Sequence, residues 1–153
     1  MSDPVRRAVV EAFYGALTTR DRATLESFLD DNVTWTISGP VDILPFCGQR
    51  VGKGEVMTLL TRDIPTLLSG LRFAAKALLV DGDRAAVLGR LTATKLEGGR
   101  SISYRIAHFI QFRDDKVIDY VSIIDSFDAV EQMLGHSLDA HEGYRVEGDK
   151  VAV

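Results

Sequence analysis

The chain has 153 residues, of which 46% are hydrophobic and 26% are charged, and its formal net charge at pH 7 is -4. This length fits one domain with a sizeable core, and this composition is that of an ordinary globular protein. Its 18 Lys and Arg residues are scattered, so it lacks the basic face that a nucleic-acid partner requires. With Cys47 as the single cysteine, an intrachain disulfide is excluded.

Membrane and export signals are absent from the sequence. The N-terminal stretch has no apolar core of the kind found in signal peptides. No apolar run approaches the roughly 20 residues that a membrane-spanning helix needs. We therefore expect a cytoplasmic protein without a membrane partner.

The first part of the chain has helical periodicity. Residues 5–17 place apolar side chains at three- and four-residue spacing, which predicts a helix. A Ser-Asp-Pro sequence at residues 2–4 provides a cap and a proline for its first turn. Asp21 can cap a short second helix over residues 22–29.

An unusually apolar segment follows a predicted strand over residues 33–38, which is rich in β-branched and aromatic residues. Residues 40–53 read as a loop, yet they include Phe46 and several aliphatic side chains. Two interpretations remain open, a loop tucked over the core and a lid on a ligand cavity. A third helix is predicted from Gly54, with a kink or break at Pro65.

From residue 71 the apolar period changes from 3.6 to 2 residues, which predicts a meander of four strands. We expect these strands at residues 71–80, 85–96, 101–113 and 116–125. A last helix is expected over residues 127–134, followed by a polar arm or tail over residues 136–153. Helices followed by an antiparallel meander indicate an α+β fold with helices on one sheet face.

One ionisable residue interrupts the apolar face of the third meander strand. By alternation the inward set of that strand is Ile102, Tyr104, Ile106, His108, Ile110 and Phe112. An imidazole at position 108 could act as an acid, a base or a hydrogen-bond donor, and the alternative is a structural histidine bonded to a buried neighbour. Tyr120 and Ser122 should share its side of the sheet and could orient a ligand or satisfy the histidine.

Two other candidates have competing interpretations. Asp125 could serve as an acid/base or as the orienting partner of His108, or it could cap the last helix. Trp35, the sole tryptophan, could line the cavity or fill the core. Arg105 and Phe109 should lie on the face opposite His108, and this mixed outer face predicts a homodimer.

Metal and phosphate sites have little support. The three histidines have no spacing typical of metal ligands. The segment GQRVGKGEV lacks the spacing of a phosphate-binding loop. We therefore expect no metal and no cofactor.

Three stretches in this order resemble the nuclear-transport-factor-2-like superfamily. They are LESFLDDNVTWTISGP, PFCGQRVGKGEV and FIQFRDDKVIDYVSIID, within a similarity that spans residues 5–135. The chain is most similar to the SnoaL-like polyketide cyclases and the ketosteroid-isomerase-like proteins. The resemblance implies one cone-shaped domain over residues 1–135, whose curved sheet surrounds a cavity, and dimers that form through the outer sheet face.

The resemblance also implies roles for particular positions. A ketosteroid-isomerase-like site would have its aspartate base where this chain has Thr36, a protonated acid at His108, and a tyrosine at Phe13 with Tyr14 next to it. A SnoaL-like cyclase site would have its acid/base aspartate at Ser122 and a histidine at His108. Members of the superfamily include isomerases, cyclases, epoxide hydrolases and dehydratases, and also proteins without activity.

We therefore predict a small-molecule-binding protein that performs cofactor-free acid/base isomerisation, cyclisation or hydrolysis on a small hydrophobic substrate. The alternative is a non-catalytic ligand-binding or dimerisation module. The predicted catalytic residues are His108 and Asp125, and the predicted substrate-binding residues are Tyr14, Trp35, Phe46, Tyr104, Tyr120 and Ser122. The expected partners are a small hydrophobic ligand and a second copy of the chain.

Overall fold

The computed structural model describes residues 3–138 of the chain. The predicted tail over residues 136–153 therefore lies mostly outside the described residues, as does Ser2 of the predicted first cap. Within the described range the fold is α+β, as the sequence predicts.

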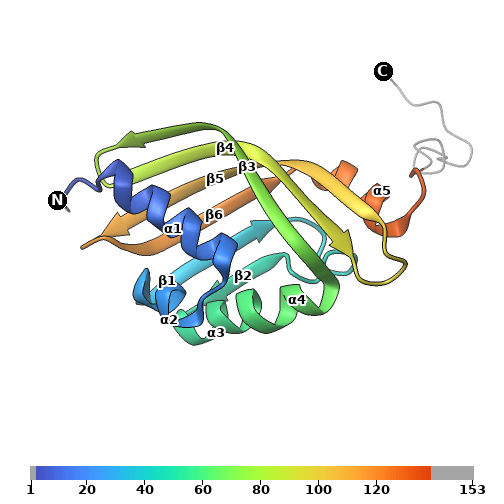
Figure 1. Cartoon of the computed structure of the whole chain (residues 1–153), viewed down its shortest axis with the longest axis horizontal. Coiled ribbons are helices and arrows are strands. Elements are labelled where there is room, and N and C mark those ends of the chain that lie inside the picture. The colour runs from blue at the N-terminus through green and yellow to red at the C-terminus, as the bar shows by residue number, and fades with distance from the viewer. Residues whose placement is uncertain (1–2, 139–153) are drawn as a thin grey trace, which may run out of the picture.

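A six-stranded sheet in the order β2-β1-β6-β5-β4-β3 forms the body of the fold (Figure 1). Its strands are β1 Leu29–Ser38, β2 Gly48–Val51, β3 Leu68–Asp81, β4 Arg84–Lys95, β5 Ser101–Arg113 and β6 Lys116–Ile124. The predicted antiparallel meander is confirmed for β3 to β6. The complete sheet is mixed, because β1 lies parallel to β6.

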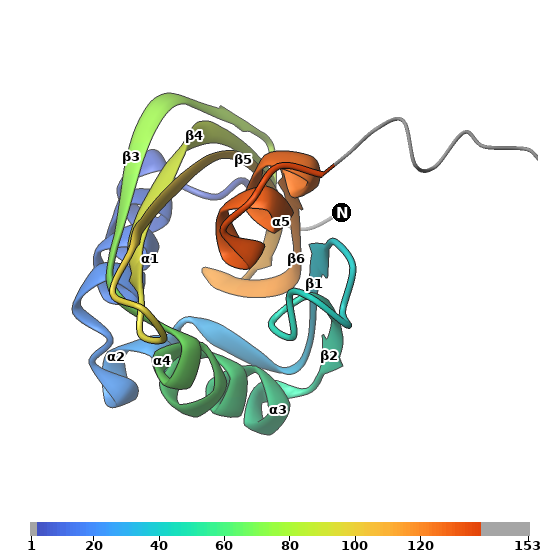
Figure 2. The ribbon, with the colours of Figure 1, turned by 90° about the vertical axis from the view of Figure 1, so that its right-hand side faces the viewer.

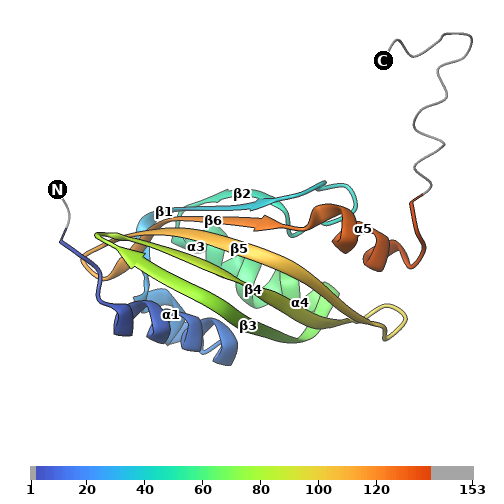
Figure 3. The same cartoon turned by 90° about the horizontal axis from the view of Figure 1, so that it is seen from above.

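The helices lie along the concave side of the sheet and at its end. They are α1 Arg7–Thr19, α2 Arg22–Ser27, α3 Lys53–Thr58, the π-helical η1 Leu59–Asp63, α4 Ile64–Leu67 and α5 Ser126–Leu134. Figure 2 shows the sheet curling round, with α1 beside β3 and with α3 and α4 below the curl. In Figure 3, α5 lies beyond the end of β6. Across residues 3–138, no helix combines the length and apolar character of a membrane span.

The N-terminal helix begins later than the sequence predicts. Its N-cap is Arg6, which makes no side-chain capping bond. The residues before it extend towards the β3–β4 turn, where the amide of Val5 donates to the carbonyl of Gly82 at 3.0 Å. The predicted cap of α2 is confirmed, because Asp21 accepts a hydrogen bond from the amide of Thr24.

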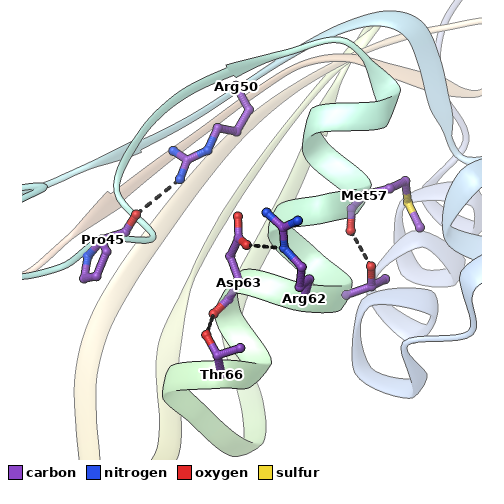
Figure 4. A network of polar contacts seen from close by, with 7 residues as sticks. Pro45, Arg50, Met57, Arg62, Asp63 and Thr66 are labelled. Atoms are coloured by element: carbon purple, nitrogen blue, oxygen red, sulfur yellow. Dashed lines mark hydrogen bonds and ion pairs between the residues drawn. The ribbon is translucent and has the colours of Figure 1, made fainter.

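The apolar loop over residues 40–53 contains an unpredicted edge strand, since β2 pairs antiparallel with β1. Arg50 of β2 holds the rest of this loop in place. Its guanidinium donates to the carbonyl of Cys47 at 2.8 Å. It also donates to the carbonyl of Pro45 at 3.2 Å (Figure 4). These two bonds fix the backbone on either side of Phe46.

The predicted break in the third helix takes the form of a π-helical segment, η1, just before Pro65. Proline has no amide hydrogen, so a regular α-helical bond to the carbonyl four residues earlier cannot form. Two threonine hydroxyls in this stretch also bond carbonyls of the preceding turn: Thr61 donates to Met57 and Thr66 to Asp63, each at 2.6 Å (Figure 4).

Phe13 of α1 lies at the centre of the aromatic core. Its ring is fully buried and meets the rings of Phe28, Trp35, Phe112 and Tyr120 in edge-to-face geometry. Burying such a side chain contributes roughly 1.5–3 kcal/mol, and the edge contacts add to it. Because these rings come from α1, β1, β5 and β6, this cluster fixes α1 against the concave face of the sheet.

Candidate functional site

A cavity of about 130 Å³ lies between the concave sheet face and the helices. An engineered protein cavity of about 150 Å³ is large enough to bind benzene. The walls are mostly apolar, and the polar or aromatic polar side chains among them are Tyr14, Thr18, Arg20, Trp35, Arg72, Tyr104, His108, Tyr120 and Ser122. No aspartate or glutamate lines this cavity in the described part of the chain.

His108 lies in the cavity wall, as strand alternation predicts. It faces inward from β5, between Val87 of β4 and Ser122 of β6. Its side chain and that of Ser122 are the two polar side chains in the otherwise apolar buried set of residues 3–138. A buried polar side chain of this kind needs a partner.

The partner of His108 is Tyr14. The phenol oxygen of Tyr14 lies 2.6 Å from Nδ1 of His108, which joins α1 to β5 across the cavity. The two rings are nearly parallel, at 17°, and Phe73 of β3 stacks against both, with its ring centroid 5.0 Å from that of His108. The imidazole orientation is therefore fixed by one hydrogen bond and by ring contacts with Tyr14, Phe73 and Tyr120.

Both members of this pair are neutral near pH 7. Burial raises the pKa of the Tyr14 phenol above its ordinary value and lowers the pKa of His108 from 6.5 to about 3. The Tyr14 hydroxyl bonds no other side chain or backbone group within residues 3–138, so it donates its hydrogen to Nδ1. We infer that the one imidazole proton is on Nε2, which makes no hydrogen bond with any described residue.

Other polar atoms in the wall also have no partner in the described residues. The indole Nε1 of Trp35 and the hydroxyl of Ser122 are buried without a hydrogen bond. Trp35 stacks on Tyr120 with ring centroids 3.6 Å apart, and Tyr120 in turn contacts His108. Burial raises the pKa of Tyr120 and of Tyr104, so both phenols keep their protons. Together these groups add unpaired polar atoms and neutral phenols to an otherwise apolar wall.

Asp125 is the one predicted site residue that the structure does not bring to the cavity. Ile124, the last residue of β6, is buried in the cavity wall, so alternation turns Asp125 away from it. Its carboxylate pairs with Arg105 at 3.2 Å. It occupies the N-cap position of α5 but makes no side-chain capping bond, so the alternative interpretation as a helix cap is not observed either.

The remaining predicted residues do meet in one place. Tyr14, Trp35, Phe46, Tyr104, Tyr120 and Ser122 all line the cavity with His108. Trp35 takes the inward position on β1, and Thr36 points away and accepts a hydrogen bond from Gln49. In residues 3–138, no three potential metal ligands lie together.

Sequence reasoning missed Phe73, Arg20 and Arg72, which also line the cavity. One signal for Phe73 is Gly89, in the interior of β4. A Cβ at this position would lie 2.7 Å from the Phe73 ring and would also meet the carbonyl of Ala74. A glycine inside a strand often marks a place where another part of the chain comes close to the backbone. Gly89 is therefore a sequence signal that a side chain packs closely against β4.

Comparison with known proteins defines the class first, as an α+β cone of the nuclear-transport-factor-2-like type. A protein of this type from Burkholderia thailandensis E264 has a TM-score of 0.73 at 22% identity, covering 87% of this chain and 98% of its own. The crystal structure of TerC with polyporic acid has a TM-score of 0.74 at 24% identity, covering 83% and 96%. At these identities the likeness shows the fold alone.

The family follows from two further matches. Residues 10–120 match the model of the SnoaL-like domain. A putative isomerase from Rhodopseudomonas palustris is 34% identical, with a TM-score of 0.73 and coverage of 83% of this chain and 93% of its own. The chain therefore belongs to the SnoaL-like family. Among curated protein sequences, none matches it.

Proposed function

We propose that this protein binds a small, mostly apolar carbonyl compound in the cavity and catalyses its cofactor-free isomerisation, cyclisation or hydrolysis. The observation that carries this proposal is the hydrogen bond from Tyr14 to His108 inside a largely apolar cavity. It leaves the Nε2–H of a neutral imidazole as a fixed donor. TerC, a structural neighbour, was co-crystallised with polyporic acid, which supports a fold of this type holding a small organic molecule.

In this proposal His108 donates a hydrogen bond to the substrate oxygen on which negative charge develops. A preoriented donor in a cavity that excludes water stabilises such a charge more than a donor in bulk water would. Neutral histidine performs this role in other enzymes, so a pKa of about 3 does not oppose it. Tyr14 acts as a positioning residue, because its hydroxyl holds the His108 ring through Nδ1.

Within residues 3–138 the cavity lining has hydrogen-bond donors but no carboxylate, which restricts the chemistry. A substrate that suits this site has an already acidic C–H next to its carbonyl, so that a strong protein base is not required. We therefore do not propose isomerisation through an aspartate base. Asp125 has no part in the mechanism because its carboxylate pairs with Arg105.

The second candidate is a non-catalytic ligand-binding protein. The missing carboxylate in the cavity wall favours it, because a binder needs no proton acceptor. Both candidates predict binding of small apolar molecules, and they differ in whether the bound molecule changes.

The test is a thermal-shift screen of small ketones, lactones, quinones and epoxides, followed by incubation of each hit with the protein in D₂O. NMR then detects exchange of protons next to the carbonyl and any new product. Catalysis predicts exchange or conversion that falls by roughly 10²–10⁴ in His108→Gln. Turnover at the wild-type rate in that variant would refute the mechanism, and stabilisation without any chemical change would support the binding protein.

We also propose a homodimer through the outer face of the sheet. The exposed apolar side chains Leu88, Phe109 and Ile123 lie there on neighbouring strands. In the strand register, Leu88 is level with Ala107 and Ile123, so this row is continuous across β4, β5 and β6. Contiguous apolar surface of this kind is typical of protein interfaces. The cytoplasmic location stays a prediction.

A further inference from the structure

The opening of the cavity carries two positive charges. Of the residues that line the cavity, Thr18 and Arg72 are the exposed ones, so the opening lies between the C-terminal end of α1 and the start of β3. Arg20, which is half-buried, lines the same cavity. Figure 3 shows α1 lying alongside β3, which it contacts.

Neither arginine side chain is paired with an acidic group. Most other arginines of the described chain form ion pairs or hydrogen bonds, but the guanidinium groups of Arg20 and Arg72 make none with residues 3–138. The nearest acidic residue in sequence, Asp21, accepts hydrogen bonds from Thr24 instead. Since no acidic residue among residues 3–138 lines the cavity, these two positive charges are uncompensated at its opening within the described part of the chain.

The backbone at Arg20 supports a specific placement of its side chain. Arg20 ends α1 in the left-handed conformation, with φ of 54°, a region that residues other than glycine seldom adopt. Its amide closes the last turn by donating to the carbonyl of Ala16 at 2.9 Å. The chain turns sharply there, and the long side chain lies at the cavity opening.

We propose that Arg20 and Arg72 bind an anionic group of the ligand, so that the ligand is an organic acid. Its apolar body occupies the cavity, and its carboxylate lies at the opening. Guanidinium groups suit this role because they stay charged and bind carboxylates in a planar, two-pronged geometry. This inference rests on the proposed function, since it names the class of ligand that the same cavity takes.

The competing explanation is that both side chains only lay their aliphatic stems along apolar surface and keep their charged ends in water. The two explanations differ in their dependence on ligand charge. A carboxylate held by a guanidinium gains a charge-assisted hydrogen bond that the matching neutral amide cannot make with the same strength.

The experiment compares three acids with their primary amides, benzoate with benzamide, trans-cinnamate with cinnamamide, and 2-naphthoate with 2-naphthamide. Calorimetric titration and amide NMR shifts of the full chain at pH 7 give the dissociation constants. We expect at least one acid to bind about tenfold more tightly than its amide, and Arg72→Gln or Arg20→Gln to remove about that factor for the acid alone. Arg90→Gln is the matched control, because Arg90 is exposed on β4 and does not line the cavity.

Three results would count against the inference, and they are distinguishable. If acids and amides bind equally well, the ligand class is wrong while the cavity proposal stands. If the preference for acids survives in both cavity variants, or falls as much in Arg90→Gln, the two arginines are not its source. If no acid and no amide shifts the resonances of cavity residues, both the inference and the proposed function are refuted.

Discussion

Tyr14 and His108 are 94 positions apart in the sequence, and their side chains meet at 2.6 Å. This bond satisfies the buried Nδ1 and leaves Nε2 without a hydrogen-bond partner among residues 3–138. The two ring contacts of Phe73 restrict the same pair from the β3 side. Every role proposed for His108 depends on this arrangement.

Tyr14→Phe removes the donor and leaves a buried imidazole nitrogen without a partner. We expect the free energy of unfolding to fall by about 1–3 kcal/mol, the cost of one unsatisfied buried polar group. Tyr104→Phe is the control, because the Tyr104 hydroxyl makes no hydrogen bond within residues 3–138, and we expect a change within about 0.5 kcal/mol. Urea denaturation measures both. Equal losses in the two variants would show that the Tyr14 bond does not stabilise the fold.

Strand alternation was enough to predict that His108, Tyr104, Tyr120 and Ser122 share one face, because a period of two residues is a local property of the backbone. It could not predict the partner of His108, since Tyr14 comes from a helix whose docking depends on tertiary packing. The parallel pairing of β1 with β6 is likewise a long-range contact.

Sequence patterns did not predict the edge strand β2 or the position of Asp125 outside the cavity. The four residues of β2 lie in an apolar, glycine-containing segment that has no strand periodicity, so they read as a loop. Asp125 is a predicted site residue at the end of the last predicted strand, over residues 116–125. Bringing it inward would require a bulge, and β6 instead ends regularly with Ile124 buried.

The glycine at position 89 gives a second stability prediction. In Gly89→Ala the new methyl group would meet the Phe73 ring at 2.7 Å and the carbonyl of Ala74, so either the ring or β3 must move. We expect a loss of about 1–3 kcal/mol from this overpacking. Gly15→Ala is the matched control, since a Cβ there meets nothing within 4 Å and lies in α1. That variant should gain up to about 1 kcal/mol from helix propensity, and a similar loss in both would contradict the packing argument.

Burial of neutral His108 makes the stability of the protein depend on pH. Burial lowers its pKa to about 3, whereas an unfolded histidine has a pKa of about 6.5. Below pH 6.5 the unfolded chain therefore binds a proton that the folded chain does not bind until about pH 3. The contribution of neutral His108 to the free energy of unfolding is therefore complete above pH 6.5. It is lost progressively as the pH falls towards 3.

His108→Gln isolates this effect, because all other titrating groups are shared. Between pH 7 and pH 5 we expect the wild type to lose about 2 kcal/mol more unfolding free energy than the variant. Denaturant titrations at both pH values give the four free energies. A parallel pH dependence in the two proteins would mean that His108 is protonated in the folded state at pH 5.

The outer sheet face predicts the assembly state. Phe109 is 54% exposed at the centre of the apolar rows on β4, β5 and β6. We expect the wild type to sediment at twice the 16.8 kDa chain mass at micromolar concentration, and Phe109→Lys to sediment as a monomer. Leu96→Lys, at a 50% exposed leucine beyond the end of β4, should leave the dimer intact. A monomeric wild type would refute the dimer.

The protonation of the His108 ring tests the central claim most directly. A two-bond ¹H–¹⁵N correlation spectrum at pH 7, assigned by comparison with His108→Gln, identifies which ring nitrogen carries the proton. Our account predicts a neutral ring with its proton on Nε2 and an unprotonated Nδ1 that accepts from Tyr14. A proton on Nδ1, or a ring that titrates near pH 6.5, would contradict it.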